Sequence, residues 1–207
     1  MSNNNIYEEF NNKINDLINQ KIQKVEYYGL RIIVDDYDNH LESKDISSYK
    51  TIHNDIHSFG IALSLHMESG DIFDIIWNNI FYCYGIEIIK NKHQDYENDA
   101  VKKWIMTDDS LWKKYINNEI MNISVLWDTN TGIVKSYKNG TEKIERIVEN
   151  MKPVTLLIFF KELENRNDRL VISTSGFIDE EEGLLFRGHD NIMVINNITT
   201  ALYYGLI

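Results

Sequence analysis

The stretch that decides the fold is FGIALSLHMESGDIFDIIW, residues 59–77. Apolar residues alternate with small or polar ones across 61–67, which is the period of a half-buried strand. The Ser-Gly-Asp sequence at 69–71 is a turn signal, and a second apolar run occupies 72–77. The stretch therefore predicts an antiparallel hairpin, and the apolar run at 81–89 predicts the third strand of a meander.

Later apolar runs predict further strands. They occupy residues 121–127, 154–160, 170–173 and 191–195. Turn signals at 129–132 and 139–140 follow the first of these runs, and the continuous run at 154–160 is expected to be central. The only proline, Pro153, directly precedes that run, where a missing N–H costs least.

Helices are predicted at three places. Apolar residues recur at three- and four-residue steps from Ile6 to Val25, which predicts an N-terminal amphipathic helix. Asp108 to Ser110 resembles a helix start, and 198–204 predicts a short terminal helix or turn. The fold class expected is α+β: one domain over 1–207, mainly antiparallel sheet, with the N-terminal helix and one or two further helices packed on it.

A short repeat accompanies the strands. Asn-Asn-Ile occurs at 78–80 and again at 196–198, and Tyr-Gly follows each within a few residues. The repeat indicates a duplicated sheet unit, approximately 59–90 and 153–207. The alternative is a chance match in a chain rich in Asn and Ile.

The formal net charge is −11. A negative field repels phosphate backbones, so nucleic acid and anionic membranes are poor partners, whereas a basic protein is a good one. The alternative is acidity that serves solubility alone. The chain shows no basic segment followed by an apolar stretch and no apolar run of the roughly 20 residues that span a membrane, so a cytoplasmic protein is expected.

Two acidic segments are the predicted contact sites for a basic partner. They consist of Asp35, Asp36 and Asp38, and of Asp179, Glu180, Glu181 and Glu182. The first segment lies in a predicted loop over 35–57 and fails the calcium-loop pattern, because His40 stands where the third oxygen ligand belongs. Solvated loops are the alternative for both segments.

No catalytic, cofactor-binding or metal-binding residue is predicted. His53 and His57 have the spacing of a helical metal pair, but the segment lacks helical periodicity, so they are interpreted as loop histidines. Cys83 lies in an apolar run and is interpreted as a buried small hydrophobe. The segment 173–177 lacks the first glycine of a nucleophile elbow, and neither a P-loop nor a dinucleotide-binding motif occurs.

Three stretches give residues 59–207 a resemblance in texture to bacterial polymorphic-toxin immunity proteins. They are the hairpin at 61–77, Trp127 after the segment holding Leu111-Trp112, and the closing run 188–195. The resemblance implies a compact acidic domain that masks a toxin, often a nuclease, and that has no catalytic residues. A non-catalytic protein-binding module is therefore expected. The alternatives are a regulatory or phage-related binding protein and an enzyme whose site is assembled from dispersed Asp, Glu and His.

Overall fold

The predicted hairpin and meander form in the computed structural model of the chain. Their strands are β5 (Ala62–Met67), β6 (Ile72–Asn78) and β7 (Gly85–Lys90). The register pairs Leu63 with Ile75 and Leu65 with Phe73, and all four side chains are fully buried. The alternation in the sequence therefore set one face of this sheet toward the core.

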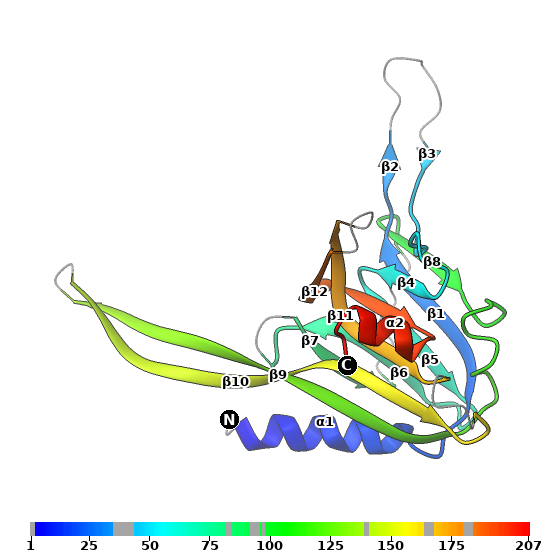
Figure 1. Cartoon of the computed structure of the whole chain (residues 1–207), viewed down its shortest axis with the longest axis horizontal. Coiled ribbons are helices and arrows are strands. Elements are labelled where there is room, and N and C mark those ends of the chain that lie inside the picture. Colours follow the sequence, from blue (N-terminus) through cyan, green and yellow to red (C-terminus); the bar gives the residue numbers. More distant parts are fainter. Residues whose placement is uncertain are drawn as a thin grey trace.

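The structure describes residues 3–34, 44–81, 84–91, 96, 98–138, 141–163, 168–179 and 184–207, and at 3–4, 130–150, 178 and 186–189 the backbone alone. The other strands are β1 (Ile22–Leu30), β2 (Ile33–Val34), β3 (Lys44–Asp45), β4 (Ile56–Phe59), β8 (Val101–Ile105), β9 (Ile120–Lys138), β10 (Thr141–Phe160), β11 (Leu170–Asp179) and β12 (Leu184–Ile195). Two five-stranded antiparallel sheets result, in the orders β7-β6-β5-β1-β8 and β4-β12-β11-β10-β9 (Figure 1). A separate two-stranded sheet joins β2 to β3.

The two sheets share one core. Tyr27 of β1, Leu156 of β10 and Trp112 from the segment after β8 are all fully buried in it. The helix α1 (Asn3–Leu17) adds Phe10 and Leu17 along one edge of the same core. A smaller apolar cluster lies on the outer face of the second sheet, where α2 (Ile198–Tyr203) covers it with Ala201. Packing two layers in this way buries the apolar faces that the two five-stranded sheets turn toward each other.

The N-terminal helix is shorter than its apolar spacing predicts. It ends at Leu17, and Asn19 adopts a left-handed conformation with φ of 64°. Ile22 and Val25, which continue the helical spacing in the sequence, instead lie buried in β1. Ile22 and Val25 are three residues apart, which fits a helical face, but the register of β1 shifts between Ile22 and Lys24 and both side chains are buried there. The sequence alone did not locate this boundary.

The helix predicted from Asp108 is wrong. Residues 109–116 form two successive turns, in which Lys113 N donates to Asp109 O and Ile116 N donates to Trp112 O. Asn117 then takes a φ of 61°, which ends the turns. Within the described residues α1 and α2 are the helices, so the fold is mainly β rather than a balanced α+β, although the predicted antiparallel sheet is confirmed.

Strands β9 and β10 are much longer than the apolar runs that predicted them. The turn expected at 129–132 is strand, and the pairing continues from Ile120 opposite Phe160 out to Lys138 opposite Thr141. Pro153 lies inside β10 rather than before it, next to a shift in register between Pro153 and Thr155. A bulge is a position where a strand tolerates the missing N–H of proline.

The loop predicted over 35–57 contains strand at both of its described ends. Lys44 and Asp45 form β3, and Ile56 and His57 begin β4. Residues 35–43 lie outside the described residues. Neither α1 nor α2 has the length and apolar content that a helix crossing a membrane requires, as far as the described chain shows.

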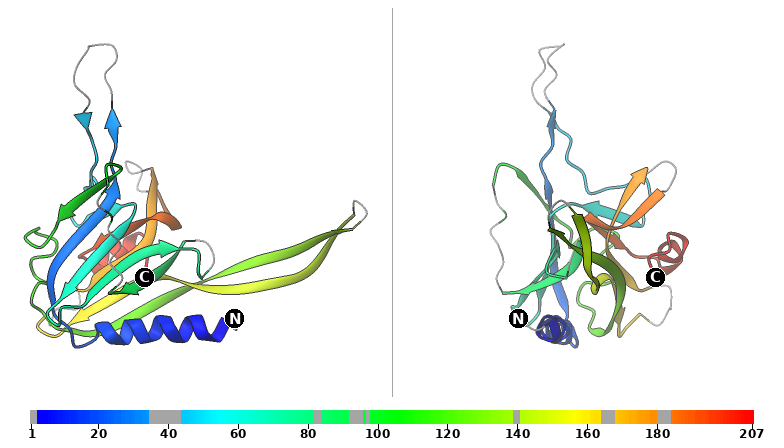
Figure 2. Two further views of the ribbon diagram at one scale, coloured as in Figure 1. Left: turned by 180° about the vertical axis from the view of Figure 1, so that it is seen from behind. Right: turned by 90° about the vertical axis from the view of Figure 1, so that its left-hand side faces the viewer.

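Two antiparallel ribbons extend from the body. The β2–β3 arm (residues 31–34 and 44–46) continues upward from β1 in Figure 1, and the β9–β10 arm (residues 128–138 and 141–152) extends to the left. The left-hand view of Figure 2 shows both ribbons clear of the two sheets, and in the right-hand view the β9–β10 arm points toward the viewer. Both ribbons lie outside the packed core and are therefore candidates for contact with other molecules.

Candidate functional site

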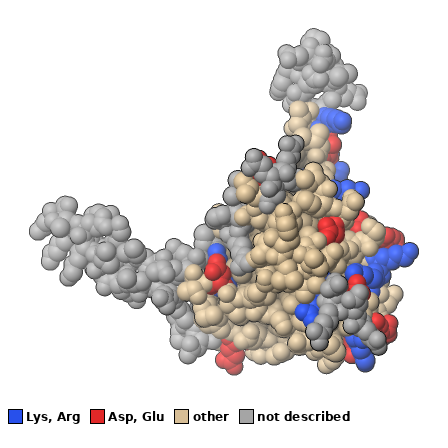
Figure 3. All heavy atoms as spheres, in the orientation of Figure 1, with Lys and Arg blue, Asp and Glu red and all other residues tan. Residues whose placement is uncertain are grey.

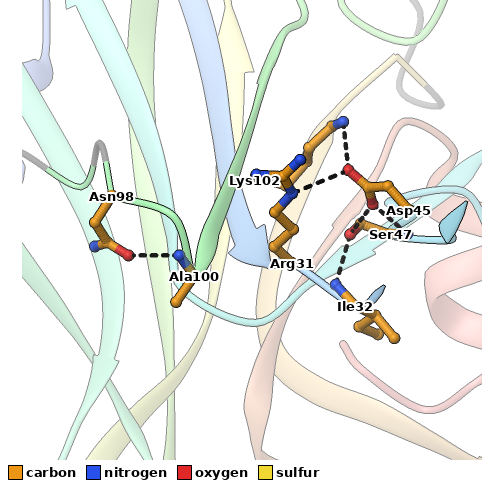
Figure 4. Close-up of polar contacts among 7 residues, drawn as sticks. All are labelled: Arg31, Ile32, Asp45, Ser47, Asn98, Ala100 and Lys102. Carbon is orange, nitrogen blue, oxygen red and sulfur yellow. Dashed lines mark hydrogen bonds and ion pairs between the residues drawn. The ribbon is translucent and has the colours of Figure 1, made fainter. Parts of the chain in front are cut away.

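The β2–β3 arm is held to the body by one carboxylate. Asp45 Oδ2 accepts from Lys102 Nζ at 2.8 Å and from Arg31 Nε at 3.3 Å, and Asp45 Oδ1 accepts from Ser47 Oγ at 2.6 Å (Figure 4). Ser47 Oγ in turn accepts from Ile32 N at 2.8 Å. The Lys102 ammonium and the Ser47 hydroxyl hold the pKa of Asp45 well below its ordinary range, so the anchor stays charged at neutral pH.

Backbone hydrogen bonding also joins the base of the arm to the segment that leads into β8. Arg31 N donates to Ala100 O at 2.9 Å. Ala100 N donates to Asn98 Oδ1 at 2.9 Å (Figure 4). The bond from Arg31 to Ala100 continues the pairing of β1 with β8 by one step past Leu30 opposite Val101. The described base of the arm is therefore fixed in direction by hydrogen bonds on both of its strands.

The base of the arm exposes large aliphatic side chains. Between 47% and 64% of the surface of each is exposed: Leu30, Ile32, Ile33, Val34 and Ile46. Pairing within the arm is limited to Ile33 with Asp45 and Val34 with Lys44. Neighbouring exposed aliphatic residues of this kind mark interaction surfaces in soluble proteins more often than single exposed ones do.

A second hairpin ends on the same side of the body. β11 and β12 extend past the core toward the side from which the β2–β3 arm rises, as both Figure 1 and the right-hand view of Figure 2 show. Asp179 is the last residue of β11 and is exposed. Asp35, Asp36, Asp38, Glu180, Glu181 and Glu182 lie outside the described residues, so the structure places only the strand ends that carry these two segments.

The buried histidine His57 is a feature that sequence reasoning missed. It was expected in a loop, but it lies in β4 with 6% of its surface exposed. Its Nδ1 lies 3.2 Å from Tyr27 Oη, and its Nε2 lies 3.8 Å from Asp109 Oδ1. Trp112 Nε1 donates to Tyr27 Oη, so this hydroxyl lies between the indole of Trp112 and the imidazole of His57.

This Asp109–His57–Tyr27 series lacks the features of a catalytic triad. The hydroxyl that would act as the nucleophile belongs to Tyr27, which is fully buried, and burial raises the pKa of Tyr27 well above its ordinary value. An activated nucleophile needs a base in hydrogen-bond reach and access to substrate. Burial also lowers the pKa of His57, although Asp109 opposes that shift. The series holds a buried polar contact between the sheets and the turns after β8.

His53 and His57 line one polar pocket of about 360 Å³ together with Lys50 and Asp109. His53 Nε2 is 2.8 Å from Tyr204 Oη, and the His53 ring stacks on Phe177. No group of three or more His, Cys, Asp or Glu side chains suited to a metal occurs among the described residues. Cys83 lies outside them.

A buried carboxylate on the outer face of the first sheet was also missed. Glu26 receives Lys24 Nζ at 2.7 Å, Lys103 Nζ at 3.0 Å, His66 Nε2 at 2.9 Å and Tyr28 Oη at 3.0 Å. Burial alone would raise the pKa of Glu26, but these four contacts outweigh it and lower the pKa to about 2. A carboxylate that stays ionised between two ammonium groups is a structural group rather than a general acid.

Register explains why this cluster could not be predicted from the sequence. Lys24 is paired with His66, Glu26 with Ser64, and Tyr28 with Lys103, so three separate strands supply the cluster. The polar alternation within β1 was the one available signal, and it does not identify the partner strands.

Comparisons of the chain with models of protein families, with curated proteins and with solved structures found no match. The functional conclusion therefore depends on the geometry of the described residues and on the sequence.

Proposed function

We propose that this chain is a non-catalytic protein-binding module that engages a partner with a basic surface. The observation that carries the proposal is that the β2–β3 arm and the β11–β12 hairpin extend on the same side of the body. In each hairpin, an acid-rich segment of the sequence connects the two strands: residues 35–43 connect β2 to β3, and residues 180–183 connect β11 to β12. The side from which they extend is called the arm side below.

Charge supports a basic partner. Residues 35–43 contain four Asp or Glu, residues 179–183 contain four more, and neither segment contains Lys or Arg. These eight acids are most of the net charge of −11. On the face seen in Figure 3, by contrast, the described acidic and basic side chains are interspersed. Complementary charge of this kind speeds encounter and rejects partners of the same sign.

The exposed aliphatic residues at the base of the β2–β3 arm supply an apolar surface for the interface. An interface needs an apolar centre surrounded by polar groups, and Ile32, Ile33 and Val34 offer such a centre beside the acid-rich segment. The Asp45 anchor holds this surface in one direction before a partner arrives, which lowers the entropy lost on binding.

The more specific form of the proposal is an immunity-like protein that masks a basic toxin. It rests on the resemblance over residues 59–207 and on the acidic arm side. A regulatory or phage-related binding protein would use the same surface, and only the identity of the partner distinguishes the two. The enzyme alternative has less support, because the Asp109–His57–Tyr27 series ends in the core.

The test uses the product of the gene beside this one, when that product is basic. Calorimetry would measure its binding to the wild-type chain and to two variants. One carries Ile33→Ala and Val34→Ala. The matched control carries Leu202→Ala, at a similarly exposed position on α2. We expect roughly a hundredfold loss of affinity in the arm variant and none in the control, because truncated anchor residues cost about 2 kcal/mol or more.

Salt and growth assays separate the general from the specific form. Affinity for a basic partner should fall as ionic strength rises. If the partner is a toxin, co-expression of the wild-type chain should restore growth and the arm variant should not. Equal affinity in the arm variant and the control would refute the arm-side surface. Binding without growth rescue would refute the immunity form alone.

A further inference from the structure

The β9–β10 arm is a second projection with different chemistry. Among the described residues its two strands pair only with each other from Asp128 opposite Lys152 to Lys138 opposite Thr141, because β11 joins β10 only between Thr155 and Ile158. Eleven residues of strand span roughly 35 Å. A two-stranded ribbon of this length is marginally stable in water unless something covers it.

The arm sequence contains the residues that a covering partner would use. The register pairs Ile133 with Ile147 and Lys135 with Ile144, so apolar residues recur near the outer end of both strands. Residues opposite one another in an antiparallel pair share a face of the ribbon. The segment 135–146 holds four Lys or Arg and two Glu, although the whole chain has a net charge of −11.

An apolar groove lies at the root of the same arm. It has a volume of about 240 Å³ and lies between α1 and the end of β6, and its lining residues are Ile6, Glu9, Phe10, Lys13, Ile80, Phe81 and Glu87. The rings of Phe10 and Phe81 contact Trp127, the last residue of β9 before the arm begins. Ile80 is 47% exposed at the groove.

The rim of this groove has the opposite charge to the arm. It carries Glu9 and Glu87, against the single Lys13, whose Nζ lies 3.1 Å from Glu9. Groove and arm thus match in both apolar content and charge. An arm cannot fold back onto its own root, because β9 and β10 run outward in continuous register. A second copy of the chain supplies both halves of this match at once.

We propose that two copies of this chain exchange their β9–β10 arms about a two-fold axis. The outer part of each arm, residues 133–138 and 141–147, lies along the groove beside α1 of the other copy. When two arms lie antiparallel side by side, the outer end of each arm reaches the root of the other arm. The distance between the two bodies then equals the length of one arm. Such a contact is isologous and closes at two copies. The arm side, which engages the basic partner, is a different surface and stays available.

Sedimentation equilibrium gives the first test. The wild-type chain should have twice its 24.4 kDa mass. A variant in which residues 129–150 are replaced by Asn-Gly should sediment as a monomer and keep the thermal unfolding of the body. A wild-type monomer at every concentration overturns the proposal, and so does a dimer that persists without the arm.

A charge exchange tests the seating of the arm in the groove and leaves the backbone intact. One variant carries Lys143→Glu and Arg146→Glu in the arm, and a second carries Glu9→Lys and Glu87→Lys at the groove. Each alone should dimerise about tenfold or more weakly, because it brings like charges together. In an equimolar mixture both contacts become attractive again, so a heterodimer of wild-type affinity should form. A control with Asp108→Lys, an exposed acid away from the groove, should dimerise normally.

The mixture decides between arm–groove seating and arm–arm contact. If the two charge-exchanged variants associate no better together than each does alone, the groove is not where the arm lies and the proposal fails. Recovery of the heterodimer supports it even if the shortened variant does not fold.

Discussion

The two arms of this molecule are attached in opposite ways. The β2–β3 arm is held by ion pairs and hydrogen bonds around Asp45, on a partly exposed surface. The β9–β10 arm grows out of an aromatic cluster in which Tyr7, Phe81 and Trp127 contact one another, and Tyr7 Oη donates to Met151 O at 3.1 Å. The polar attachment fixes the direction of the β2–β3 arm, whereas the apolar attachment connects the root of the β9–β10 arm to the core. Changes at the two bases should therefore differ in kind.

The largest effect on stability is expected at the root of the β9–β10 arm. Phe81 is 7% exposed and contacts Tyr7, Phe10 and Trp127. Phe81→Ala should lower the free energy of unfolding by about 4 kcal/mol, because it removes a buried ring and leaves a cavity. Urea denaturation would measure the loss, with the exposed Leu202→Ala as a control that should change little. A loss below that of the control would show that the cluster is not continuous with the core.

A smaller effect is expected within β1, the strand that continues into the β2–β3 arm. Glu26→Gln should cost about 2 kcal/mol at neutral pH, since it leaves Lys24 and Lys103 beside a neutral amide.

The pH dependence of this effect follows from the lowered pKa. The carboxylate has a pKa of about 2 in the folded chain, against an ordinary value of 4.5. Its contribution is complete above the ordinary value and is lost as pH falls toward 2. The stability difference between the wild-type chain and the variant should therefore shrink in acid. A difference that does not change between neutral and acidic pH would contradict the assignment.

The smallest effect on global stability, and the most local one, is expected at Asp45. Asp45→Asn should leave the unfolding transition of the body nearly unchanged but speed amide hydrogen exchange at Ile32 and Ile46, whose N–H groups bond to Ser47 Oγ and Ile32 O. Because the pKa of Asp45 is lowered, protection at these amides in the wild-type chain should persist below the ordinary carboxyl pKa and disappear only in stronger acid. Unchanged exchange in the variant would mean that backbone pairing alone holds the arm.

Sequence reasoning succeeded where structure is local. The alternation at 61–67 predicted a hairpin with the correct buried face, and the short helix near 198 formed with Asn197 as its N-cap. It failed where the decision belongs to distant partners. Ile22 continues a helical spacing in the sequence but pairs with Met67 in the sheet. The polar residues around Thr129 are typical of a turn, but they form strand because Thr129 pairs with Met151. Propensity over a few residues cannot register such pairing.

The acidic segments of the candidate site are visible in the sequence, and their role in contacting a partner stays a prediction. The structure places the strand ends that carry them on one side of the body. Asp45 and the exposed Ile32 to Val34 gave no signal, because their roles depend on Lys102 from a strand far along the chain. The groove beside α1 depends equally on Ile80 and Phe81 meeting that helix.

The strand pairing also has a consequence for how the chain folds. β5 with β6 and β9 with β10 join neighbours in sequence, whereas β4 with β12 joins Ile56 to Ile195 and so closes most of the chain into a loop. Local hairpins form within microseconds, but pairings of high contact order are slow. We expect the long ribbon to appear early and the β4–β12 closure to limit the folding rate, so that pulse-labelled amides of β4 become protected last.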